Sequence, residues 1–444
     1  MPDTLTAELN KMDLDRKHRY TSYLDFYNGL QWTRQSRREK QLTFNYAKVF
    51  IDKITSYLIS NSQFAVDPIT ETVADNKVAA SAEKSINQVI LDNNLEQLDF
   101  DTEIDTAILG DGCYKVTWDT ARKRVRVTAP DIQGIYAWWQ PDDPSQVYKV
   151  ACRYQMPDAK GTLVWIIEVW TDTLYLLYRN DVLTKSTRNP YGFIPYIIFP
   201  NLRQPKQFWG LSDIPVIMET QQELNRALTQ VSTILELSGN PIAVLENVEQ
   251  AEDIAVKPGA VWELPEKAKA YLLDLLSGGG INLHMAYIDI LYRILHDTSE
   301  SPKAAYGRTE RDLSGVALEI ELQPLLHKVN RKRLIRSVVY RKRSQMILQL
   351  LKIFTNQDFT KCHTRIAWAP VLPMDRERLV QNETALIQAG VHSRHLAMNV
   401  LGVEDPETEW IRWSKERDQI LKQNQSYSVK AKGTGESVAP PQGA

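Results

Sequence analysis

The sequence predicts an α+β protein that is mainly helical. Apolar residues recur at helical spacing in the first 110 residues, from 213 to 238, and again from 281 to 354. Between 114 and 200 the pattern changes to alternating residues with turn signals, which is typical of strands. The chain has 444 residues, of which 43% are hydrophobic and 24% charged. It is therefore long enough for two or three domains with a sizeable core.

The N-terminal region is expected to contain helices at 5–30 and 44–60 and two more within 75–110. The first of them combines Arg16 and Arg19 with several tyrosines. Aromatic rings and arginines of this kind can stack on bases and meet phosphates. An amphipathic helix packed on its neighbours has the same pattern, however, and we favour that interpretation.

An antiparallel meander is expected after these helices. Its strands are predicted at 114–118, 125–128, 147–155, 163–171 and 173–178. Thr-Asp at 171 and Asn-Asp at 180 are typical turn signals. A strand and turn at 191–201 then lead to the first of two central helices.

The first central helix has local signals at both ends. Ser212 or Asp213 can cap the first turn with a side-chain oxygen, and Pro215 fits that turn because its missing N–H costs nothing there. Gly239 and Pro241 end the helix. Its apolar positions are Ile214, Ile217, Met218, Leu224, Leu228, Val231 and Leu235. The opposite face is expected to hold Glu219, Glu223, Arg226, Gln230 and Thr233.

The second central helix is expected at 281–297, after a segment with little helical period at 240–280. Its apolar face is predicted to contain Leu283, Tyr287, Ile288, Leu291, Ile294 and Leu295. The polar face would hold Asn282, Asp289, Arg293 and His296. A polar loop follows, and then a third, very long helix from 314 to 354.

The middle of this long helix is basic. Its cations, with no acid among them, are Lys328, Arg331, Lys332, Arg333, Arg336, Arg341, Lys342 and Arg343. Such a run is the best candidate for a nucleic-acid contact in the chain. These positions nevertheless spread around most of the helix, while apolar neighbours such as Leu325 and Val339 need burial.

Three short motifs follow one another along the chain, and we refer to them together as the sequence series. The first is Trp209-Gly210-Leu211-Ser212-Asp213-Ile214, followed by Gln222 and Asn225. The second is Leu313-Ser314-Gly315-Val316-Ala317-Leu318, followed by Pro324-Leu325-Leu326 and Lys328. The third is Ala389-Gly390-Val391-His392-Ser393, which leads into Val403-Glu404-Asp405-Pro406-Glu407. In their order and spacing these stretches resemble the portal proteins of tailed bacteriophages, most of all those of long-tailed phages.

The resemblance implies a portal-protein fold with a wing, a stem, a clip and a C-terminal helical crown, assembled as a ring. The implied parts are a wing at 1–208, a first stem helix at 209–239, a clip at 240–280, a second stem helix at 281–297, a channel loop at 298–313, a long helix and strand returning to the wing at 314–374, a helical crown at 375–425 and a disordered tail at 426–444.

The resemblance also implies a function. A ring of about twelve copies at one vertex of the capsid would form the channel for packaging and ejection of double-stranded DNA. The implied partners are other copies of the chain, the DNA, the terminase large subunit, the major capsid and scaffolding proteins, and the head-completion or neck proteins. The implied location is the virion, with the host cytoplasm during assembly. The terminase would supply ATP hydrolysis, so no catalytic residue, metal or cofactor is expected.

Four groups of residues receive roles in this way. The loop expected to touch DNA contains Lys303, Arg308 and Arg311. The stem face expected to line the channel holds Asn282, Asp289, Arg293 and His296. An acidic clip surface that would dock the motor or the neck includes Glu246, Glu249, Glu252 and Asp253, although a solvated surface without a partner has the same composition. Contacts with a neighbouring subunit, favoured over contacts with DNA, are expected for Lys328, Arg331, Lys332 and Arg336.

Familiar motifs of catalysis do not occur in the sequence. It has no Walker sequence, no Gly-x-Ser-x-Gly elbow and no His-Glu-x-x-His pair. The three cysteines are far apart, which fits a reducing compartment better than a disulfide framework or a zinc site. No run approaches the roughly 20 apolar residues that span a bilayer, so membrane insertion is not expected.

Two other functions remain open on the sequence alone. One is a metal-dependent DNA-processing enzyme, such as a nuclease with a dispersed acidic site. The other is a head–tail scaffold that binds only proteins. The net charge of −2 does not separate these from a DNA conduit, because a wall that bound phosphates tightly would hold DNA instead of passing it.

Overall fold

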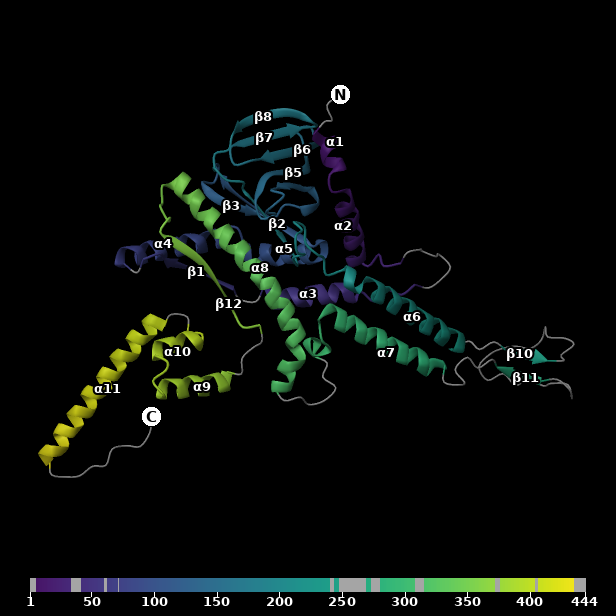
Figure 1. Cartoon of the computed structure of the whole chain (residues 1–444). Helices are drawn as coiled ribbons and strands as arrows, with labels where there is room; N and C mark the ends of the chain where they lie inside the picture. The colour runs from purple at the N-terminus through teal and green to yellow at the C-terminus, as the bar shows by residue number, and fades with distance from the viewer. Residues whose placement is uncertain are drawn as a thin grey trace. The chain divides into compact units, whose positions relative to one another are not determined.

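The computed structural model describes residues 5–32, 41–59, 62–70, 72–239, 243–246, 269–272, 280–307, 315–371, 376–403 and 406–434. It divides into two compact units, Met1–Ala369 and Pro370–Ala444. Figure 1 shows the elements along the chain. The fold is a mixture of helices and antiparallel sheets, as predicted.

The first unit begins with helices. These are α1 (Leu5–Lys11), α2 (Leu14–Tyr27), α3 (Tyr46–Leu58), α4 (Val73–Asp92) and α5 (Leu95–Leu109). Side-chain oxygens begin two of them, because Asn45 accepts from the N–H of Lys48 and Thr72 accepts from the N–H of Asp75. The chain leaves α5 through Gly110, whose φ of +95° suits glycine.

Two antiparallel sheets follow. The three-stranded sheet has the order β3-β2-β9 and contains β2 (Asp111–Asp119), β3 (Arg124–Thr128) and β9 (Tyr196–Pro200). The turn η1 (Ile132–Gly134) then leads to a five-stranded meander of β4 (Ile135–Trp139), β5 (Val147–Pro157), β6 (Leu163–Trp170), β7 (Leu174–Arg179) and β8 (Val182–Arg188). The predicted single meander is therefore wrong in one respect, since β2 pairs with β3 and with the distant β9, and neither β2 nor β3 pairs with β4.

The central pair comes next. Helix α6 (Pro215–Gly239) and helix α7 (Gly280–Ser299) lie side by side, with the hairpin strands β10 (Ala243–Glu246) and β11 (Lys269–Leu272) between them in sequence (Figure 1). The turn η2 (Lys303–Tyr306) precedes α8 (Gly315–Thr355). A last strand, β12 (Cys362–Trp368), pairs with β1 (Ser62–Pro68) and so returns the chain to its N-terminal part.

The second unit contains α9 (Arg376–Gln388), α10 (Arg394–Val400) and α11 (Pro406–Thr434). Three helices broken near Gly390 and Gly402 were predicted here, and they are present. The predicted disorder from Ser426 onward is wrong at its start, because α11 continues to Thr434. Lysine and alanine near this end favour helix, Gly433 lies only at its last turn, and the prolines come later in the sequence.

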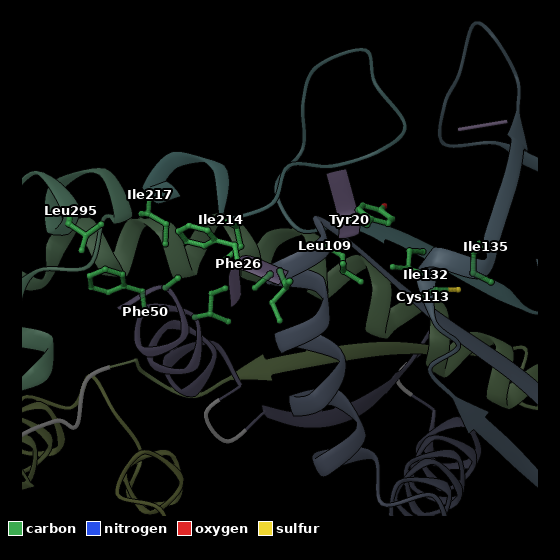
Figure 2. Packing of buried hydrophobic residues seen from close by; sticks show 14 of the residues in the cluster. Tyr20, Phe26, Phe50, Leu109, Cys113, Ile132, Ile135, Ile214, Ile217 and Leu295 are labelled. Carbon is green, nitrogen blue, oxygen red and sulfur yellow. The ribbon is translucent and has the colours of Figure 1, made fainter. Parts of the chain in front are cut away.

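The largest hydrophobic core joins the early helices to the central pair. Figure 2 shows Ile214, just before α6, Ile217 of α6 and Leu295 of α7 near Phe50 of α3. Within α7 the buried side chains begin only at Ile288. The core therefore includes α6 from its first turn to Val231 and α7 from Ile288 onward, while the first two turns of α7 bury no side chain.

Candidate functional site: the roots of the central helices

The turn that starts α6 is closely packed. A Cβ on Gly210 would lie 2.5 Å from the carbonyl oxygen of Gly110 and 2.5 Å from the Cβ of Pro200, so only glycine fits. The indole of Trp209 covers the guanidinium of Arg16, whose Cζ lies 3.7 Å from the ring centroid. The Trp-Gly pair of the sequence series therefore has a structural explanation.

A buried carboxylate, Asp111, holds this turn in place. The N–H of Gly210 donates to Asp111 Oδ1 at 2.7 Å, and the hydroxyl of Tyr20 donates to Oδ2 at 2.5 Å. Burial raises the pKa of Asp111 to about 6, although both hydrogen bonds and Arg16 act in the opposite direction. Asp111 thus joins α2, β2 and the approach to α6 through a group that titrates in mildly acidic solution.

The stability of the subunit is expected to depend on pH through Asp111. Unfolded aspartates titrate near about 3.9, so the folded state binds this proton more tightly. The contribution of Asp111 to the free energy of unfolding should therefore fall by about 2 kcal/mol as the pH rises from about 4 to about 7. In urea denaturation, the difference between wild type and Asp111→Asn should change by this amount between the two pH values. The exposed Asp25→Asn is the control, and a constant difference for Asp111→Asn would contradict the assignment.

Ser212 and Asp213 fix the first turn of α6. The Oγ of Ser212 donates to the carbonyl of Ile108 at 2.5 Å and accepts from the N–H of Ile214 at 3.0 Å. The backbone N–H of Asp213 donates to the carbonyl of Ala107 at 2.9 Å. Of the two predicted capping residues, Ser212 makes the capping bond, which leaves the carboxylate of Asp213 available to α8.

Two lysines of α8 hold the Asp213 carboxylate. Lys332 Nζ donates to Oδ2 at 2.6 Å, and Lys328 Nζ lies 3.1 Å from Oδ1. All three side chains are at most 5% exposed. Burial alone would raise the pKa of Asp213, but the two ammonium groups outweigh it and hold this pKa well below its usual range. Burial lowers the pKa of Lys332 despite the nearby carboxylate.

Further along α8, two arginines pair with carboxylates of α5. The guanidinium of Arg336 donates to both oxygens of Glu103, at 2.5 and 2.8 Å, and to the carbonyls of Pro200 and Asn201, both at 2.9 Å. Arg343 likewise donates to both oxygens of Asp99. Arg336 is fully buried, which requires pairing of this kind.

These contacts correct the interpretation of the basic helix. Lys328, Lys332 and Arg336 are buried and paired within the subunit, so the prediction that they meet DNA or a neighbouring subunit is wrong. Their partners lie far away in the sequence, so the charges along α8 alone could not predict these ion pairs. Arg331 is exposed and pairs with Glu300 at 2.6 Å.

Lys328 connects the roots of both central helices, by which we mean the first turn of α6 and the end of α7. Its Nζ also donates to the carbonyl of Ser299, the last residue of α7, at 3.1 Å. One ammonium group of α8 therefore contacts the start of α6 and the end of α7. This arrangement fixes the spacing of the pair at the core.

A network of amides joins α6 to the segment between α2 and α3. Asn225 is buried, accepts from the N–H of Phe44 at 2.9 Å and donates to the Oε1 of Gln31 at 2.7 Å. Gln221 and Gln222 donate to the carbonyls of Phe44 and Gln31. The Gln222 and Asn225 of the sequence series thus anchor α6, since buried amides need such partners.

Helix α7 has three different faces. Its buried face contains Ile288, Leu291, Leu295 and His296. A polar exposed face contains Asn282, Asp289 and Arg293. Between them lies an apolar stripe that stays exposed, formed by Leu283, Tyr287, Ile290 and Ile294.

The single apolar face predicted for α7 is therefore divided into a buried and an exposed half. In α6 the apolar positions Ile214, Ile217, Leu224 and Val231 are buried as predicted, while Leu235 is exposed.

His296 does not lie on the polar face, so its predicted place in a channel wall is wrong. It is 5% exposed, and its ring packs edge-on against Phe50, Tyr292 and Tyr306 at centroid distances of 5.2, 4.5 and 5.7 Å. Its Nδ1 lies 2.5 Å from the carbonyl oxygen of Ser301. Helical spacing placed His296 beside Arg293, but the end of α7 is enclosed by α3 and η2.

The sequence of the chain matches a known protein family. The model of the family "Phage portal protein, SPP1 Gp6-like" matches residues 7–423. The chain belongs to the phage portal protein family. No curated protein matches the chain.

The remaining predicted residues of the portal protein fall partly outside the described ranges. Lys303 lies in η2, and its Nζ is 5.1 Å from the ring centroid of Tyr292. Arg308 and Arg311 lie outside the described residues. In the acidic segment Glu246 is an exposed residue of β10, and Glu249, Glu252 and Asp253 lie outside the described residues.

Portal proteins are structural components and not enzymes. Among the described residues, no group of three or more His, Cys, Asp or Glu side chains is placed to hold a metal ion. None of the described helices is both long and apolar enough to cross a membrane. The ion pairs described above provide mechanical support, because α8 holds the first turn of α6 and the end of α7 against the core.

Sequence reasoning missed three of the acids that organise this site, namely Asp99, Glu103 and Asp111, and it proposed Asp213 only as a cap of α6. A signal for two of them exists. Asp99 and Glu103 are four residues apart on α5, and so share a helix face. Arg336 and Arg343 are seven apart on α8 and also share a face. Matching these spacings would have suggested that the two helices pair through their charges.

Proposed function

We propose that the portal protein forms a ring whose channel passes double-stranded DNA, with α6 and α7 as the stem. The observation that carries this proposal is the exposed apolar stripe of α7. Its four residues follow the i, i+4, i+7, i+11 spacing of one helix edge. Leu283 is 75% exposed and Ile290 is 51% exposed.

A continuous apolar stripe of this kind favours a protein contact, whereas scattered exposed apolar residues are ordinary. The buried face of α7 is already used by its own subunit. In a ring each subunit offers two different surfaces to its neighbours. We therefore assign the stripe to the contact with the next copy, which leaves the polar face of α7 free.

The polar face with Asn282, Asp289 and Arg293 would then line the channel. It carries both signs of charge, and a wall of this kind lets the DNA backbone pass because it releases few counterions. Lys303, with Arg308 and Arg311, would touch phosphates from the loop after α7. Such contacts position the DNA without reading its sequence.

The other parts follow the same proposal. Residues 1–208 and the returning segment 314–374 would form the wing, 240–280 the clip and 375–425 the crown. The clip acids, among them Glu246, would dock the terminase motor and later the neck proteins. The ring would sit at the capsid vertex with the capsid and scaffolding proteins, after assembly in the host cytoplasm.

The stripe can be tested by placing a charge in it. Ile290→Glu should prevent ring formation, because a carboxylate would be buried without a partner at the contact. Native mass spectrometry and negative-stain microscopy should show large rings for wild type and small species for the variant. Ile69→Glu is the matched control, since Ile69 is 52% exposed outside the stripe. Normal rings of Ile290→Glu would contradict the proposed stem contact.

A further inference from the structure

Helices α5 and α8 are joined by charges on their facing sides. Glu103 and Asp99 of α5 meet Arg336 and Arg343 of α8. Two residues along a helix correspond to a rotation of about 200°. Residues two positions away from these four therefore lie on the far sides of the helix pair.

The far side of α8 is basic and apolar. Leu334 and Val338 are 73% and 54% exposed, and Arg341 and Gln345 continue the same edge at helical spacing. Lys342 flanks this edge and is also exposed. Among the described residues no carboxylate pairs with the side chain of Arg341 or Lys342. We call these five residues the outer stripe of α8.

The far side of α5 is acidic. Asp101 and Asp105 are exposed there, two residues beyond Asp99 and Glu103. Partial burial together with the neighbouring carboxylates of Asp131 and Asp101 raises the pKa of Asp105. No lysine or arginine among the described residues forms an ion pair with these three acids. Asp101, Asp105 and Asp131 are the acidic patch.

We propose that the outer stripe of α8 in one subunit packs on the acidic patch of the next subunit around the ring. This inference rests on the proposed ring and names a second pair of surfaces for it. A ring contact needs two different faces of one chain, and here the two faces point away from each other and carry opposite charges. Each lacks counterions of its own, so the contact neutralises both.

DNA is a less suitable partner for the outer stripe. Contacts with phosphates are made by cations and polar groups, whereas Leu334 and Val338 need an apolar surface. The alternation of cations with aliphatic side chains therefore favours a protein surface.

Charge reversal tests the pairing. Two double variants reverse the charges, namely Arg341→Glu with Lys342→Glu and Asp101→Lys with Asp105→Lys. Each should raise the subunit concentration needed for ring formation at least tenfold. The chain that carries all four substitutions should recover most of this loss, because the charges are complementary again. Reversal of Lys77 and Lys84, exposed lysines of α4, is the matched control and should leave assembly unchanged.

Folding and assembly can be separated in this experiment. The exposed substitutions should leave the urea concentration at the midpoint of unfolding nearly unchanged, and Asp101→Lys alone serves if the double acid variant unfolds. Rings that form normally from both reversed variants would overturn the inference while the proposed ring stands. Loss of rings without recovery in the fourfold variant would overturn the pairing as well. Wild-type subunits that form no ring would overturn the proposed function and this contact with it.

Discussion

Asp213→Asn is expected to lower the free energy of unfolding of the subunit by about 3–5 kcal/mol, because it leaves two buried ammonium groups without their carboxylate. Lys328 and Lys332 are only 4% and 1% exposed, so water cannot replace the lost partner. Urea denaturation at neutral pH measures the effect.

The control for this prediction is Glu223→Gln. Glu223 pairs with the exposed Arg226 at 2.7 Å, and pairs of this kind contribute at most about 1 kcal/mol. A loss no larger for Asp213→Asn than for the control would show that the Asp213 cluster does not stabilise the fold. A large loss would also predict poor assembly, since Lys328 joins the starting turn of α6 to the end of α7.

Arg336→Met is expected to have a comparable effect on stability, about 3–5 kcal/mol, because it leaves Glu103 buried and unpaired. Glu103 is 2% exposed. The double variant Glu103→Leu with Arg336→Met should recover more than half of the loss, since the unpaired charge is then removed. The remainder, about 1–2 kcal/mol, should come from the carbonyls of Pro200 and Asn201, which lose their donor.

Arg365→Met provides the comparison for an exposed ion pair. Arg365 lies 2.8 Å from Asp67, and both side chains are at least half exposed, so the expected loss is within about 1 kcal/mol. If the double variant at Glu103 and Arg336 were no more stable than Arg336→Met, the buried charge would not be the cause of the destabilisation.

These ion pairs explain how the portal protein can hold a slender helix pair firmly. The roots of α6 and α7 are tied to α8 by Lys328 and Lys332, and α8 is tied to α5 by Arg336 and Arg343. The first two turns of α7 bury no side chain in this core. A chain of this design leaves one edge of α7 exposed, while the first turn of α6 and the end of α7 stay fixed in the core.

The sequence by itself determined the helices and most strands of this protein, because their signals are local. Ser212 and Pro215 begin α6 and Gly239 ends it, as the capping and glycine rules predict. The series around Trp209, Gly210 and Asn225 also predicted the family, which the family match confirms. The order and spacing of such motifs can be read directly from the sequence, without knowledge of how the chain packs.

Only the tertiary structure decided which charged and apolar residues meet a partner inside the subunit. Arg336 and Glu103 are 233 positions apart, so no local pattern shows that they meet. Leu295 and Ile294 look alike in the sequence, yet one is fully buried and the other is 41% exposed. The physical reason is that the sequence of a helix shows which side of it is apolar or charged. Whether a given side is buried depends on which other elements pack against it.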